Sequence, residues 1–264
     1  MGHPLIHLGY AFELSSRELA IEALGLATTS YNFLHKYLDD PAYSRPSGYS
    51  TSSPLDILQQ VSKDKRFDGL FEEPGADNIE SLFQNHEDAV LEHWNAWRIS
   101  HPVTQFEDSQ HAATALLVAS QGCSSTKFDF FLVHLLTTSH AVRILIPFIP
   151  PSFHVALVRQ WWLLTLAVYI AQLRPQINVG NITNYDLKGK DWKWAEKQAV
   201  ESKRSLDAHY VKAIRAMKEA AKTWGDKNEF YLKAAVKFGE TFDGWGGFGP
   251  SSADDAEAAT QRRK

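Results

Sequence analysis

Apolar residues recur at helical spacing along most of the chain, and strand-like alternation of useful length is absent. We therefore predict an all-α fold. The expected architecture is a single multi-helix, bundle-like domain over residues 1–243, followed by a small, polar and disordered tail over residues 244–264. The helical segments are expected at residues 3–13, from 15, from 54, 78–97, 106–120, 128–145, 152–173, 191–223 and 228–239.

Capping signals place several of the helix ends. Ser15 and Glu18 have capping-box spacing, and Ser53 followed by Pro54 suits the N-cap and N1 positions of another helix. Residues 39–54 are crowded with Pro, Ser and Gly, which indicates a loop. Gly225 is placed to end the helix predicted over residues 191–223.

Composition narrows the class of protein. The 264 residues are 44% hydrophobic and 12% aromatic, enough to bury a substantial core. The longest apolar run, Trp161 to Ala171, is shorter than the roughly 20 residues of a membrane span, so we predict a buried core helix and no membrane span. A net charge of −4 argues against a nucleic-acid partner. The single cysteine, Cys123, suits a reducing compartment, and we expect a cytoplasmic protein.

Two pairs of histidines lie in apolar helical segments. His3 and His7 are four residues apart, so their rings fall within about 40° of one helical face and can chelate one metal ion; alternatively, they cap the helix or face solvent. His134 and His140 are six apart, which turns them roughly 120° from each other. His134 has the more apolar surroundings, where a buried imidazole needs either a backbone carbonyl or a metal as partner.

A third group occurs in LDAHYVKAIRAM, residues 206–217, where His209 and Lys212 share a helical face. A protonated lysine is not a metal ligand, and such a lysine also suits a salt bridge or a solvated face.

Adjacent tryptophans either fill the core or line a cavity for a planar aromatic molecule. The sequence contains no P-loop, GxSxG or HExxH motif. The remaining histidines are interpreted as structural: His35, His86, His93, His101, His111 and His154.

Three blocks of the sequence, taken together, resemble the questin oxidase-like family of fungal secondary metabolism. They are HPLIHLGYAFE, FDFFLVHLLTTSHAVRIL and LDAHYVKAIRAM, and they cover most of residues 3–217. The resemblance implies an α-helical oxidoreductase that inserts oxygen into, and opens, an aromatic polyketide ring such as an anthraquinone. It also implies either an NADPH-requiring Baeyer-Villiger-type oxidase or an oxygenase with a histidine-bound non-haem iron, so the expected cofactor is NADPH, iron or both.

The resemblance assigns roles to individual residues. His7, His134 and His209 match the family's blocks and become the expected metal ligands, with Lys212 as a catalytic residue that tunes or completes the site. His3 and His140 are expected to support these ligands or replace one of them. Three histidines from three helices can converge inside a bundle, as ligands in helical bundles do.

One departure from the family matters. Its members usually carry a long region ahead of the first block, and this chain begins almost inside that block. If a segment is missing, the first helix should leave an apolar face open to water. Two alternatives to the enzyme therefore stay open: a non-catalytic helical protein that binds a planar ligand, and an inactive, shortened remnant of the family.

Overall fold

The computed structural model describes residues 2–121 and 127–249, and its secondary structure is mostly helical (69%). The all-α prediction is confirmed, because these residues form twelve α-helices and only four strands of two residues each. The first helices are α1 (His3–Glu13), α2 (Arg17–Thr29), α3 (Lys36–Asp39), α4 (Pro54–Lys63), α5 (Asn78–Asn95) and α6 (Pro102–Val118). The others are α7 (Phe130–Leu145), α8 (His154–Ala171), α9 (Gly180–Thr183), α10 (Trp192–Glu201), α11 (Ala208–Trp224) and α12 (Phe230–Thr241).

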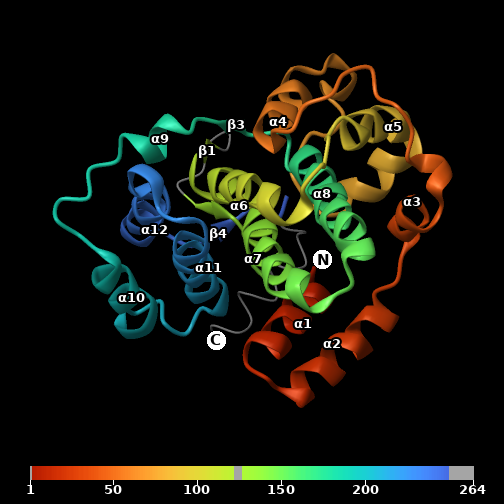
Figure 1. Cartoon of the computed structure of the whole chain (residues 1–264). Coiled ribbons are helices and arrows are strands. Elements are labelled where there is room, and N and C mark those ends of the chain that lie inside the picture. The colour runs from red at the N-terminus through yellow and green to blue at the C-terminus, as the bar shows by residue number, and fades with distance from the viewer. Residues whose placement is uncertain (1, 122–126, 250–264) are drawn as a thin grey trace, which may run out of the picture.

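Helix α7 lies at the centre of the molecule and packs against α1, α6, α8 and α11 (Figure 1). Helices α9 to α12 lie on one side of this centre, α3 to α5 lie on the other, and α1 and α2 lie below it in this view. The central position explains why α7 is so apolar: twelve of its sixteen residues are buried. Its buried threonines and serine donate hydrogen bonds to backbone carbonyls three or four residues earlier, which satisfies them without water.

The chain's two most apolar helical stretches, Phe130–Phe148 and Pro151–Ala171, are long and apolar enough to cross a membrane by length and composition alone. Within the fold, 72% and 56% of their most apolar windows are buried against other parts of the protein. Buried core helices commonly have this composition. Tryptophans from α8 fill the same core, where Trp161 donates a hydrogen bond to the carbonyl of Leu135 at 3.1 Å.

Most of the predicted helix ends are found. Ser53 caps α4 by accepting a hydrogen bond from the Asp56 amide at 3.2 Å, and Gly225, with a φ of 81°, ends α11. The cap of α2 is one residue later than predicted: Ser16 accepts the bond, whereas Ser15 takes a left-handed φ of 53°. The helix predicted over residues 191–223 is two helices, α10 and α11, because the chain turns between them and Asp207 caps a new start.

Helix α1 crosses α7 at close range. A Cβ on Gly9 would lie 2.6 Å from the Cβ of Ala141, so only glycine allows the two backbones to approach this closely. Polar contacts hold the same helices together further along. Glu13 at the end of α1 accepts hydrogen bonds from His140 of α7 at 3.2 Å and from Arg215 of α11 at 2.7 Å.

Short strands bring distant segments together. β1 (Ser120–Gln121) pairs antiparallel with β3 (Gln176–Ile177), and β2 (Phe128–Asp129) pairs parallel with β4 (Trp245–Gly246). The predicted tail thus begins inside described structure, since residues 244–249 pack on the domain. Its remaining residues, 250–264, and Cys123 lie outside the described residues.

Candidate metal centre

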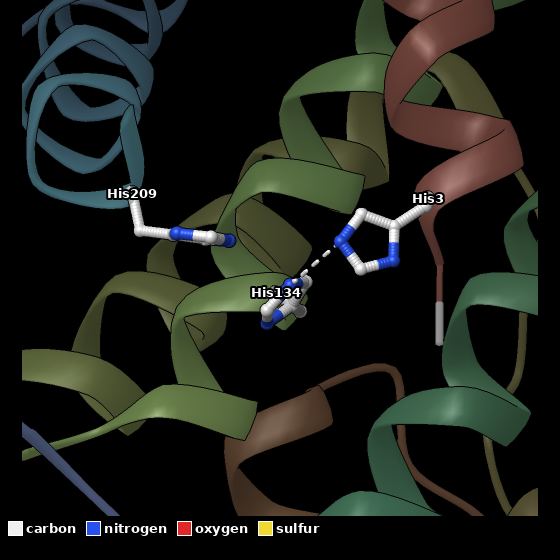
Figure 2. Close-up of side chains that lie close together, drawn as sticks. All are labelled: His3, His134 and His209. Atoms are coloured by element: carbon white, nitrogen blue, oxygen red, sulfur yellow. Dashed lines mark hydrogen bonds between the residues drawn. The ribbon is translucent and has the colours of Figure 1, made fainter. Parts of the chain in front are cut away.

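Three histidines from three helices meet beside the start of α7. One nitrogen each of His3, His134 and His209 lies within 4.8 Å of the other two (Figure 2). The Nε2 atoms of His3 and His134 are 3.3 Å apart, and the ring centroids of His134 and His209 are 5.0 Å apart. We call these three residues the histidine triad.

The orientation of His134 is fixed by the backbone of its own helix. Its Nδ1 lies 2.7 Å from the carbonyl oxygen of Phe130, an acceptor, so Nδ1 carries the proton and donates it. The lone pair of the neutral ring is therefore on Nε2, which points at His3 in Figure 2. Histidines that bind metals commonly use this arrangement, with one nitrogen hydrogen-bonded and the other left to the metal.

Asp207 positions His209. As the N-cap of α11, its Oδ1 accepts hydrogen bonds from the amides of His209 at 2.9 Å and Tyr210 at 3.2 Å. The same oxygen is 3.9 Å from Nδ1 of His209. Its other oxygen, Oδ2, accepts the indole hydrogen of Trp245 at 2.6 Å. One carboxylate therefore fixes both the start of α11 and a ring from β4.

All three imidazoles are kept neutral. Burial lowers the pKa of His134 to about 4, and the neighbouring His3 and His209 lower it further. The hydrogen bond to the Phe130 carbonyl raises the pKa but does not outweigh these effects. Burial also lowers the pKa of His3 and of His209, and Lys212 lowers both further. Near neutral pH each ring thus offers a lone pair, which a metal ion requires.

The triad fits a transition-metal ion in donor type and nearly in spacing. Imidazole nitrogens suit iron, zinc and copper. Two such nitrogens bound at roughly 2.1 Å around a tetrahedral ion lie about 3.4 Å apart, close to the separation of the His3 and His134 nitrogens. A shift on the order of 1 Å would bring His209 to the same spacing.

His7 lies next to the triad but outside it. Its ring centroid is 6.3 Å from that of His3, and its Nδ1 lies 3.4 Å from Oε1 of Glu22 in α2. The structure therefore brings His3, the alternative ligand, together with the other two. The assignment of His7 as a ligand stays a prediction.

His140 faces a different set of groups. Its Nε2 is 3.2 Å from Glu13 and also 3.2 Å from Arg215, and its Nδ1 is 3.2 Å from Arg143. Burial lowers the pKa of His140 against the pull of Glu13. With both ring nitrogens engaged, this side chain ties α1, α7 and α11 together.

Lys212 lies one turn beyond His209 on α11. Its Nζ is 5.7 Å from the ring centroid of Tyr10, and burial lowers its pKa. Its charge acts on the triad, since it lowers the pKa of both His3 and His209. Its catalytic role stays a prediction.

His93 shows what a structural histidine looks like in this protein. Its Nδ1 is 2.7 Å from the hydroxyl of Tyr49, and its Nε2 is 2.8 Å from Asp64. Protein groups engage both nitrogens and leave no lone pair for a ligand. Nε2 of His154 lies 3.0 Å from the Ile149 carbonyl oxygen, and the ring of His111 stacks on Phe230.

Aromatic rings that the sequence did not single out border the triad. Phe130 lies 4.8 Å from His134 and 4.5 Å from His209 between centroids, and Trp245 lies 6.2 Å from His209. Phe130 stands in a block that the resemblance highlighted, but Trp245 falls in the predicted tail. Aspartate is a preferred N-cap residue, and Asp207 stands two residues before His209 at the start of a predicted helical segment. This pattern could have identified Asp207 from the sequence.

Fold and site together define a mostly helical protein whose three-histidine cluster could hold a metal ion. The chain belongs to the questin oxidase-like family, whose sequence profile matches residues 1–217. It is similar to a Baeyer-Villiger oxidase of Pestalotiopsis microspora, at 24% identity over 235 residues that cover 82% of this chain and 52% of that protein. It is also similar to a questin oxidase of Aspergillus terreus, at 25% identity over 235 residues that cover 82% and 51%.

The extent of these matches is itself a finding. The chain spans about half the length of the curated relatives it matches. The family match ends within α11, so α12 and β4 lie beyond it.

Proposed function

We propose that this chain is a metal-dependent oxidoreductase that inserts oxygen into, and opens, the ring of an anthraquinone-like polyketide. The single observation that supports it most is the convergence of His3, His134 and His209, far apart in sequence, on one point. Membership of the questin oxidase-like family and the oxidases among its relatives support the reaction class. NADPH, which the family resemblance implies, is part of the proposal as the electron donor.

In this proposal His3, His134 and His209 hold a non-haem iron, which when bound supplies the redox chemistry of the oxidase. The Phe130 carbonyl keeps the proton of His134 on Nδ1, so Nε2 stays directed at the site. Asp207 holds the start of α11 and therefore His209. Lys212 places a positive charge near the triad, where it would stabilise a phenolate or enolate oxygen of the substrate.

Metal analysis of the purified protein tests the proposal. We expect near-stoichiometric iron in the native chain and its loss from a His134→Ala variant, because removing one of three ligands weakens the site. A His35→Ala variant is the matched control, since His35 stacks on Tyr31 and lies outside the triad. Turnover of an anthraquinone, with and without NADPH, should follow the iron content.

Two results would overturn this function. One is a folded His134→Ala variant that keeps both its iron and its turnover. The other is a native chain that takes up no iron when supplied with it yet binds a planar aromatic molecule, which would instead establish the non-catalytic binding protein.

A further inference from the structure

Residues 244–249, which we call the strap, cross the domain beside the histidine triad. The family match ends well before them. Gly244, Gly247 and Gly249 all have positive φ values, of 106°, 87° and 78°, so the strap takes a path that other residues rarely adopt. At Gly247 a Cβ would come within 2.5 Å of the Asp129 carboxylate.

Several contacts hold the strap in place. The amide of Phe128 donates to the carbonyl of Gly244 at 3.2 Å, next to the β2–β4 pairing. The indole of Trp245 donates to Asp207, and the Gln172 amide, oriented to satisfy both groups, donates to Asp129 at 2.7 Å and to the Gly247 carbonyl at 3.2 Å. The strap is therefore built as part of the site's border.

The strap presents an exposed aromatic ring next to the triad. Phe248 is 57% exposed, although a phenylalanine on a well-anchored segment would normally be buried. Its centroid lies 5.1 Å from Phe130, whose ring contacts both His134 and His209. Phe131 and Trp245 flank the same two rings, at 6.0 Å from Phe248 and 5.9 Å from Phe130.

We propose that one face of a planar, fused-ring aromatic substrate stacks on Phe248 beside the triad, and that Phe130, whose ring is tilted by 38° from that of Phe248, borders the same wall. This inference rests on the proposed function and identifies residues that determine its specificity. Rings at offset or tilted geometry with centroids 4.5–7 Å apart attract one another, and a flat substrate extends the same series. The Trp245–Asp207 hydrogen bond fixes the wall relative to His209.

Binding of 1,8-dihydroxyanthraquinone to the purified chain tests the wall. Its dissociation constant can be measured from tryptophan quenching and from the shift in ligand absorbance. Phe248→Ala should weaken binding roughly tenfold and leave the iron content unchanged, because it removes stacking area without touching a ligand. Phe248→Trp should restore binding. Phe153→Ala is the control, since Phe153 is equally exposed and precedes α8.

The outcomes separate the wall from the proposed function. A native chain that does not bind the probe, or a Phe248→Ala variant with unchanged dissociation constant and KM, overturns the wall even if iron and turnover are present. Binding that depends on Phe248 in a chain that holds no iron supports the wall and overturns the oxidoreductase. Since Phe248 is exposed, its replacement should leave the melting temperature unchanged.

Discussion

At the scale of single residues, the pKa values of two partly buried carboxylates, Asp129 before α7 and Glu13 at the end of α1, are shifted in opposite directions. Burial raises the pKa of Asp129 to about 6. The amides of Leu132 and Phe131 donate hydrogen bonds to its Oδ1, which lowers the pKa but does not outweigh burial. Burial also opposes ionisation of Glu13, but hydrogen bonds from His140 and Arg215 outweigh it and lower the pKa to about 2. Ionised Asp129 therefore costs stability, whereas ionised Glu13 contributes to it.

Asp129→Asn should stabilise the protein at pH 8 by less than the roughly 3 kcal/mol that the raised pKa alone implies, because the Gln172 amide loses its charged acceptor. The folded pKa of Asp129 lies above the unfolded value, so its ionisation above about pH 4 opposes folding, and an amide avoids that cost. Asparagine also caps helices well and would keep both amide bonds of α7. The gain should be nearly constant above about pH 7 and should shrink as the pH falls through 6 towards 4, as measured by urea unfolding.

Glu13→Gln provides the opposite case. Because the folded pKa of Glu13 is lowered, its contribution is present above the unfolded value of 4.5 and is lost as the pH falls towards 2. This variant should be destabilised at pH 8. Equal effects of the two substitutions on stability at all pH values would contradict the raised pKa of Asp129 and the lowered pKa of Glu13.

Two of the three histidines of the triad were expected from the sequence. His134 and His209 were identified because each stands in a block that resembles the family. His3 and His7 share one helical face, so spacing alone cannot decide which of them meets the other two. That depends on how α1 crosses α7, a non-local contact set by Gly9 and Ala141.

At the scale of elements, the crossing of α1 over α7 is what carries His3 to the site. Gly9→Ala should destabilise the fold by about 1–3 kcal/mol, because the new methyl group would lie against the Ala141 backbone. If the triad holds iron as proposed, the variant should also contain less iron, since α1 carries His3. Urea unfolding and metal analysis on the same samples measure both effects.

Gly25→Ala in α2 is the matched control for this substitution. A Cβ there meets nothing within 4 Å. The change should therefore stabilise the helix by about 0.5–1 kcal/mol and leave iron content unchanged. If both variants behaved alike, the close crossing would not matter for the site.

Periodicity predicted most of the helices because long apolar repeats leave little choice of structure. The break between α10 and α11 was missed because residues 202–207 contain neither glycine nor proline. The strap was missed for a different reason. Its pairing partners, Phe128 and Asp129, are more than 100 residues away, and local composition around Trp245 indicates only a polar tail.

At the scale of the whole molecule, large apolar side chains are exposed around α1 and α2. Within α1 itself Phe12 is the exposed large apolar side chain, and the expectation of an apolar face open to water at the first helix stays a prediction. A hollow of about 360 Å³ lies between Phe12, Ala20 and Phe148. The exposed apolar residues in this region are Phe12, Leu14, Ile21, Leu24 and Phe148.

We expect the purified chain to bind a hydrophobic fluorescent dye at this face. Replacing Ile21 and Leu24, each 61% exposed, by lysine should reduce dye fluorescence and change stability by less than about 0.5 kcal/mol. Val200→Lys on α10, an equally exposed position outside this region, is the control. Unchanged dye fluorescence in the double variant would show that the dye binds elsewhere.

The three histidines of the triad also bear on how the chain is held together. His3 and His134 are 131 residues apart, and His209 follows on a third helix. An ion shared by all three would close two long loops, a constraint that the unfolded chain lacks. Stability would then rise with the logarithm of free metal concentration. Binding of the ion and docking of α1 and α11 onto α7 would then be thermodynamically coupled, so each would favour the other.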